Sequence, residues 1–108
     1  MDKSVFRARI DAEKQELKVL SETGKQSRAP VELDQQSIGR LSRMDAIQQQ
    51  SMDLAREERR KARIAMLTAA LRRVDEDEFG FCLSCGEEIS IKRLEIDPTV
   101  TLCVDCQR

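Results

Sequence analysis

Histidine, tyrosine and tryptophan are all absent from this chain, and phenylalanine occurs only three times in its 108 residues. Without histidine, the sequence lacks the commonest general base and the commonest ligand of catalytic zinc sites. It also shows no pair of catalytic acids, no nucleophile with a matching base and no glycine-rich phosphate loop. These absences argue against an enzyme.

Long apolar segments are missing as well. No run approaches the ~20 residues that a membrane-spanning helix needs. The first residues are charged and do not lead into the apolar stretch of a secretory signal. We therefore expect a cytoplasmic protein that makes no membrane contact. With so few aromatic side chains and 36% charged residues, the composition indicates long solvated helices joined to a small module that needs a metal to fold.

All four cysteines lie near the end of the chain. Cys82 and Cys85 form one Cys-x-x-Cys pair, and Cys103 and Cys106 form a second pair after 17 intervening residues. Each pair can bind one ion from a tight turn, and two such turns complete a tetrahedron of thiolates. Gly86 follows the first pair, where the turn favours a residue that tolerates positive φ. The spacing predicts one structural zinc ion per chain.

Other uses of the cysteines fit less well. A disulfide framework requires an oxidising compartment, and a thioredoxin-like redox site requires a βαβ pattern that the sequence does not show. Four thiolates also bind a single iron, and the sequence leaves that alternative open.

The remaining sequence predicts a mostly α fold: a long antiparallel helical hairpin, or coiled coil, followed by a small four-cysteine zinc-finger module. The expected elements are a helix over about 2–22, a tip loop over about 23–36 and a long helix over about 37–74. The hairpin then spans 1–74 and the module 75–108.

A seam of apolar residues along the first helix, interrupted by Glu13, predicts how the hairpin pairs. With the tip near residues 24 to 36, Leu20 is expected beside Leu41, and Phe6 beside Leu54 or Ala55. Nine of the thirteen residues from 62 to 74 are apolar, and this half of the long helix is expected to pack on the zinc module. The residues expected to face the module are Ile64, Leu67 and Leu71.

Basic residues gather on the long helix, with seven Arg or Lys between residues 56 and 73. A solvated helix face is the ordinary explanation of such a run. The alternative is a zinc-containing nucleic-acid-binding protein that uses this helix. The net charge of −1 and the acidic residues 75–78 oppose phosphate binding.

The chain resembles the DksA/TraR family of C4-type zinc-finger regulators. The resemblance rests on residues 74–89, on Ile91-Lys-Arg-Leu-Glu, on the Pro-Thr pair at 98 and 99, and on Leu-Cys-Val-Asp-Cys at 102–106. It implies a bacterial transcription regulator that binds RNA polymerase directly through the secondary channel, as a monomer and without sequence-specific DNA contact. The hairpin would enter the channel, while the module and the adjoining helix dock at its rim.

The tip departs from the family pattern. Members similar to DksA carry an Asp-x-x-Asp-x-Ala motif, and the corresponding positions here are Gly39, Ser42 and Met44. The nearest acidic residues are Asp34 and Asp45. The residues that the resemblance assigns to partner binding are Asp34, Ser42, Asp45, Arg59 and Arg93.

Some family members also respond to the alarmone ppGpp through a set of basic residues. Arg59 matches one of these, but Ala62, Met66, Asp97 and Gln107 stand where those members have cations. Since a guanosine tetraphosphate requires several cations, the resemblance implies weak or no ppGpp dependence.

Overall fold

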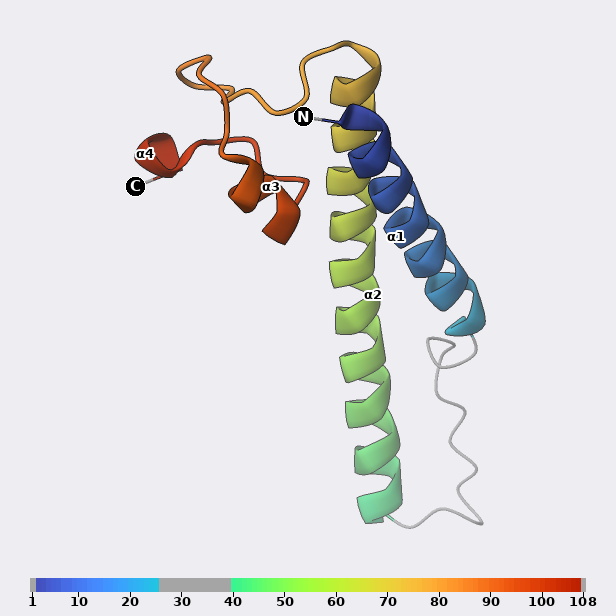
Figure 1. Cartoon of the computed structure of the whole chain (residues 1–108). Coiled ribbons are helices and arrows are strands. Elements are labelled where there is room, and N and C mark those ends of the chain that lie inside the picture. The colour runs from blue at the N-terminus through green and yellow to red at the C-terminus, as the bar shows by residue number, and fades with distance from the viewer. Residues whose placement is uncertain (1, 26–39, 108) are drawn as a thin grey trace.

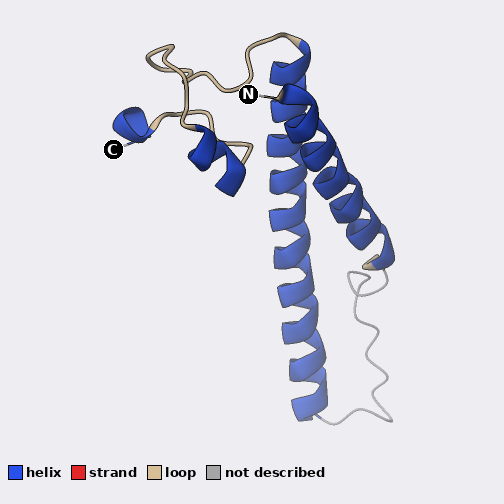
Figure 2. Cartoon of the chain, viewed as in Figure 1, coloured by secondary structure: helices blue, strands red, loops and turns tan. Residues whose placement is uncertain are grey.

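A computed structural model describes residues 2–25 and 40–107, with side chains from residue 43 onward in the second part. Four helices follow one another along the chain (Figure 1): α1 (Lys3–Thr23), α2 (Arg40–Asp75), α3 (Ile91–Ile96) and α4 (Val104–Gln107). The described part contains no strand, only an isolated antiparallel bridge between Phe81 and Glu88 (Figure 2). The prediction of a mostly helical hairpin followed by a cysteine module is confirmed. None of the described helices has the length and apolar character needed to cross a membrane.

The helix boundaries follow local signals. Asp2 precedes α1 in extended conformation, and its carboxylate accepts a hydrogen bond from the backbone N–H of Ser4 at 3.0 Å. This bond caps the first turn, and hydrogen bonds from Ser4 lower the pKa of Asp2. The expected tip loop and the first expected turn of the long helix lie outside the described residues.

Helix α1 runs antiparallel to α2, but it lies against the C-terminal half of α2 (Figure 1). Polar contacts along the whole of α1 fix this pairing. They are Lys3 with Asp77 at 3.3 Å, Arg7 with Asp75, Glu13 with Arg63 at 2.6 Å, and Ser21 with Glu57 at 2.5 Å.

The predicted register is therefore wrong. Phe6 does not lie beside Leu54, because the next residue, Arg7, pairs with Asp75. Leu20 does not lie beside Leu41, because the next residue, Ser21, bonds to Glu57. A connection of sixteen residues between Thr23 and Arg40 does not impose a tight turn, because closure entropy changes slowly with loop length. Apolar burial decides instead, and it brings α1 to the most apolar part of α2.

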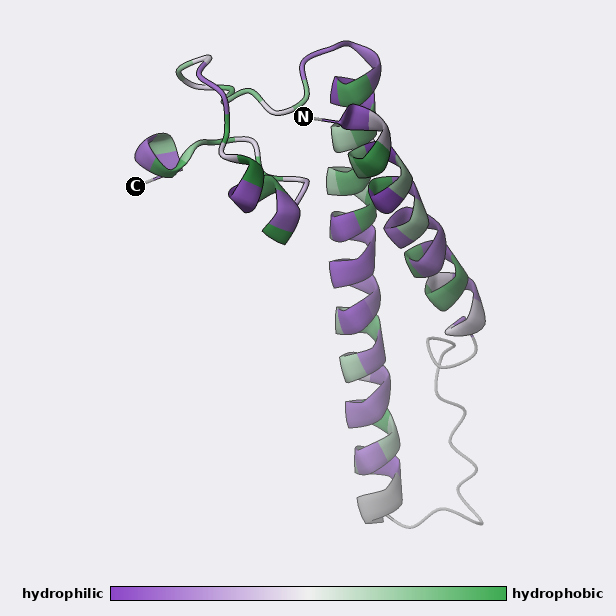
Figure 3. Cartoon of the chain, viewed as in Figure 1, coloured by the Kyte–Doolittle hydropathy of each residue, from purple (hydrophilic) through white to green (hydrophobic). Residues whose placement is uncertain are grey.

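The hairpin and the cysteine module share one hydrophobic core. Its buried members come from α1, from α2 and from the module: Phe6, Ile10, Leu67, Ala70, Val74, Phe79, Cys82, Ile89 and Leu94. The rings of Phe6 and Phe79 are 5.4 Å apart and tilted by 47°, a favourable aromatic arrangement. Figure 3 shows hydrophobic residues gathered where the three parts meet, and a mostly hydrophilic N-terminal half of α2.

This core only partly matches the expectation for α2. Leu67 is fully buried among residues that include those of the module, as predicted. Ile64 and Leu71 instead line grooves beside α1, Ile64 with Ser21 and Leu71 with Ala8. The prediction is wrong for Ile64, because α1 occupies that side of α2, whereas Leu71 also packs against the core that includes the module.

Replacing Phe6 tests the register. We expect Phe6→Ala to lower the free energy of unfolding of the zinc-loaded chain by about 3–5 kcal/mol, the usual cost of removing a buried phenylalanine. The matched control is Val5→Ala, which changes a side chain that is 61% exposed and should cost less than about 0.5 kcal/mol. Urea unfolding followed by circular dichroism measures both. Equal effects of the two substitutions would contradict the shared core.

Candidate metal centre

The first cysteine pair sits in a short hairpin-like loop. The backbone N–H of Cys82 donates to the carbonyl of Glu87 at 2.8 Å, and that of Ile89 donates to Gly80 at 2.7 Å. The loop closes with a bond from the N–H of Gly86 to the carbonyl of Cys82 at 2.9 Å. Gly86 has a φ of +77°, as predicted. An added Cβ there would meet nothing within 4 Å, so the backbone conformation, and not lack of space, requires glycine.

The second cysteine pair opens the short helix α4. Cys103 accepts a backbone hydrogen bond from Gln107 at 3.0 Å. Two contacts hold this pair in place: the N–H of Leu83 donates to the carbonyl of Thr101 at 2.8 Å, and Nε of Arg93 donates to the carbonyl of Leu102 at 3.0 Å. Each cysteine pair is therefore shaped by backbone hydrogen bonds, and the second pair also by the side chain of Arg93.

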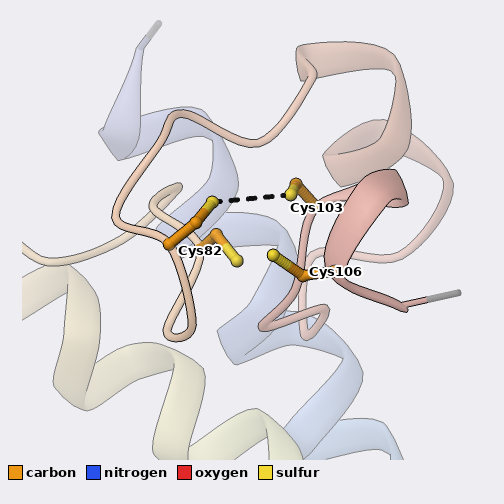
Figure 4. Close-up of side chains that lie close together, drawn as sticks. Cys82, Cys103 and Cys106 are labelled. Carbon is orange, nitrogen blue, oxygen red and sulfur yellow. Dashed lines mark hydrogen bonds between the residues drawn. The ribbon is translucent and has the colours of Figure 1, made fainter.

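The four sulfur atoms gather around one point. All of them lie within 4.8 Å of one another, and the sulfurs of Cys85 and Cys103 are 3.7 Å apart. A tetrahedron with zinc–sulfur bonds of about 2.3 Å has sulfur–sulfur edges of roughly 3.8 Å. Figure 4 shows Cys82, Cys103 and Cys106 directed toward one another from the two turns. The cluster therefore fits a tetrahedral metal ion.

The pKa values of two thiols in the cluster are shifted in opposite directions. The pKa of Cys82 is lowered to about 6, because backbone N–H groups, first that of Cys85, donate to its sulfur. The pKa of Cys106 is raised to about 12 by the neighbouring thiols, first that of Cys103. Four negative charges in so small a volume repel one another, so a divalent ion is required for all four to be thiolates. Because four thiolates leave no open position, such an ion supports structure and not catalysis.

The residues that the resemblance assigned to partner binding do not form one cluster. Asp45 and Arg59 are exposed on α2, fourteen residues or about 21 Å apart along the helix. Arg93 is half-buried and holds the second cysteine pair through Leu102. Asp34 lies outside the described residues, and so does the side chain of Ser42.

A groove of about 450 Å³ separates α2 from the module. It brings together Met66, Asp97 and Gln107, three of the positions where ppGpp-responsive family members are basic. Ala62 does not line it. The rest of the lining is mainly apolar, with Arg73 as its cation.

Sequence reasoning missed the polar contacts between α2 and its neighbours. Arg63 forms ion pairs with Glu13 of α1 and with Asp97 of the module. Glu57 is buried at 3% exposure and bonds to Ser21. One signal was present: Glu13 interrupts the apolar seam of α1, and a charged residue at such a position needs a partner.

Loss of the metal should affect more than the module. We expect zinc-loaded wild type to contain one zinc per chain, and Cys103→Ser to bind none tightly. Apparent binding free energies for such sites are about 10–16 kcal/mol, and Cys82 belongs to the core shared with both long helices. The variant should therefore lose helix content as well.

Elemental analysis and circular dichroism measure these two effects. The control is Ser90→Ala, since Ser90 is exposed and its side chain makes no capping bond to α3. Binding should weaken as the pH falls, because zinc displaces protons from the thiols. A metal-free protein with unchanged helix content and melting temperature would show that the metal is not structural.

Comparison with known proteins agrees with the cysteine geometry. The family model of the prokaryotic dksA/traR C4-type zinc finger matches residues 77–108. A protein called RNA polymerase-binding transcription factor DksA, from Haemophilus influenzae, is 44% identical over 57 residues, 53% of this chain and 39% of that protein. The protein of the same name from Escherichia coli is 42% identical over 57 residues, which are 53% of this chain and 38% of that protein. The match thus spans about two fifths of the length of these curated relatives.

The structural likeness extends further along the chain. Transcription factor DksA2 from Pseudomonas aeruginosa superposes with a TM-score of 0.80 at 25% identity, over 97% of this chain and 79% of that one. The matched zinc finger is of the C4 type and the four sulfurs surround one position, so the chain holds one structural zinc ion. Residues 77–108 therefore form a zinc finger of the prokaryotic dksA/traR C4 type, and the chain as a whole is similar in fold to a DksA-type transcription factor.

Proposed function

We propose that this protein is a bacterial transcription regulator that binds RNA polymerase directly, through the secondary channel, and modulates initiation. The observation that carries the proposal is the likeness to a DksA-type transcription factor over 97% of the chain. This likeness covers the helical hairpin as well as the zinc finger. Curated relatives named as polymerase-binding factors support the same partner. The protein would act in the cytoplasm as a monomeric binding factor, without an enzymatic activity of its own and without sequence-specific contact to DNA.

The shape of the molecule suits a narrow channel. The principal extents are 63 × 29 × 19 Å. Because α1 ends near the level of Glu57, about 25 Å of α2 projects beyond it at ~1.5 Å per residue. In the described structure this projecting part of α2 exposes Met44, Ile47 and Asp45. We propose that it enters the channel while the broader end, with the zinc module, stays at the rim.

A groove beside Leu17 supplies a candidate rim contact. Its volume is about 340 Å³, and its other lining residues are Arg56, Arg59, Arg60 and Arg63. Three of the four arginines pair with acids of this chain: Arg56 with Asp53, Arg60 with Glu57, and Arg63 with Glu13. Arg59 is exposed and forms no ion pair with a described residue. We therefore propose that Arg59 meets an acidic group of the polymerase.

The same pairing weakens the case for nucleic-acid binding by helix 56–73. An arginine already paired with a carboxylate releases fewer counterions from a duplex, so it contributes less to affinity. Lys61 is similarly paired, with Glu58 at 3.6 Å. We do not propose this alternative.

The groove between α2 and the module supports weak or absent ppGpp dependence. The carboxylate of Asp97, which faces this groove, accepts hydrogen bonds from Arg63 and Thr99. Gln107 accepts one from Arg93. Arg73, the cation in the groove, has its pKa lowered by burial, because burial disfavours the charged form. One partly buried arginine beside a carboxylate is a poor site for a tetraphosphate.

Direct binding to polymerase is tested with purified components. We expect zinc-loaded wild type to be retained by immobilised RNA polymerase holoenzyme. Arg59→Glu should weaken binding about tenfold, or ~1.4 kcal/mol, because a repulsive contact replaces an attractive one. The control is Lys61→Glu, an equal change of charge on an exposed residue of the same helix. Failure of the wild type to bind would refute the proposed function, whereas equal binding by both variants would exclude only the role of Arg59.

The ppGpp proposal needs a separate assay. On a polymerase whose own alarmone site has been disabled, transcription from a ppGpp-sensitive ribosomal promoter is measured with this protein, with and without the nucleotide. We expect ppGpp to change the effect of the protein less than about twofold, equivalent to ~0.4 kcal/mol. A strong ppGpp-dependent gain would contradict the assignment. It would mean that other residues, such as Lys92, supply the missing cations.

A further inference from the structure

Three arginines from the two long helices contact one short segment of the module. The segment, residues 95–99, comprises the last two residues of α3 and the three residues after it, on the way to the second cysteine pair. Arg9 of α1 contacts its beginning, while Arg63 and Arg73 of α2 contact its end. We refer to these three residues as the arginine clamp.

Arg63 is the centre of the clamp. Its Nε and Nη2 donate to the two carboxylate oxygens of Glu13, at 2.6 and 3.3 Å. Its Nη1 donates to Oδ1 of Asp97 at 3.1 Å and to Oγ1 of Thr99 at 2.9 Å. One planar guanidinium group thus joins α1, α2 and the module, and the fixed directions of its N–H groups restrict all three at once.

The acceptor side of this contact is also ordered. Both the backbone N–H and the hydroxyl of Thr99 donate to Oδ1 of Asp97, at 3.0 and 2.7 Å. Burial alone would raise the pKa of Asp97, but the hydrogen bonds from Thr99 and Arg63 lower it overall. Thr99 is 3% exposed, and Pro98 between them is fully buried. The segment therefore presents a rigid, ionised acceptor to Arg63.

The other two arginines hold backbone carbonyls of the same segment. Arg9 donates to the carbonyls of Glu95 and Ile96 at the C-terminal end of α3, where a cation is favourable because the last carbonyls of a helix have no partner within it. Nη2 of Arg73 donates to the carbonyl of Thr99 at 3.4 Å. The clamp therefore reaches the segment from both long helices.

The shared apolar core does not by itself set the angle between module and hairpin, because apolar contacts have little directional preference. The covalent connection between them, residues 75–78, is exposed and cannot fix the angle alone. We propose that the arginine clamp sets the orientation of the zinc module relative to the hairpin, with Arg63 as the positioning residue.

The clamp also determines the shape of the groove between α2 and the module. Arg73 lines one wall of this groove, and Asp97 and Thr99 line the other. A rotation of the module about the core would therefore change the width of the groove. Under the proposed function, the clamp keeps the zinc module and the projecting helix α2 in one fixed geometry for the polymerase.

Residual dipolar couplings of the zinc-loaded, ¹⁵N-labelled full chain test the proposal, because they report orientation and not stability. In the wild type we expect amides of the hairpin and of the module to fit one alignment tensor. In Arg63→Met the module should need a separate and smaller tensor, while zinc content and helix signals persist. Lys61→Met is the control, since Lys61 lies two residues away and its ion pair is with Glu58 of its own helix.

A second variant covers the case in which Arg63→Met fails to fold. Asp97→Asn removes the charged acceptor and leaves the pair between Arg63 and Glu13 intact. It should reduce the module tensor by a smaller amount. If the variants that fold keep a single common tensor, the clamp does not set the orientation and the proposal is wrong.

Polymerase binding by the same proteins separates this proposal from the proposed function. If wild type binds polymerase and both Arg63→Met and Asp97→Asn bind more weakly than Lys61→Met, the orientation of the module matters for docking, since Asp97 lies outside the groove that Arg59 and Arg63 line. If wild type does not bind at all, the proposed function fails, but the dipolar couplings still decide whether the clamp orients the module.

Discussion

The tetrathiolate zinc centre is the constraint on which the rest of this structure depends. Its four sulfurs lie within 4.8 Å of one another, and one of its ligands, Cys82, is also a buried member of the hydrophobic core. A chain with three phenylalanines and 36% charged residues has little apolar surface to offset the conformational entropy lost on folding. The metal supplies the missing free energy. Because a ligand belongs to the core, that free energy also supports the packing of both long helices.

The broad end of the molecule combines two kinds of interaction. The apolar core brings α1, α2 and the module together through residues such as Phe6, Leu67 and Phe79, and burial of this kind supplies stability without direction. Around it lie directional contacts: the ion pairs along α1 and the arginines that hold residues 95–99. Together, the apolar core and the directional contacts hold the broad end of the molecule in one arrangement, from which α2 projects.

The two ends of α2 differ in how much they are packed by the rest of the described structure. The last turns of α2 are packed by α1 and by the module, while its described N-terminal turns expose apolar side chains such as Met44 and Ile47. A helix without an apolar partner over several turns gains little from tertiary packing. In the proposed complex, the walls of the polymerase channel would contact the apolar side chains that these turns expose in the described structure. The end of the molecule that contains α1 and the zinc module would then hold this helix in position.

The sequence by itself determined the two long helices and the metal site, because both follow from local rules. Two cysteines three positions apart, with Gly86 after them, specify a metal-binding turn whatever the rest of the fold does. Charged and apolar periodicity likewise predicted the helices. The register of the hairpin was decided only by the tertiary structure, because a connection of sixteen residues allows several registers and the largest apolar burial selects one. The partners of Arg63 were decided in the same way: Glu13 and Asp97 are 50 and 34 residues away along the chain, and no local pattern brings them together.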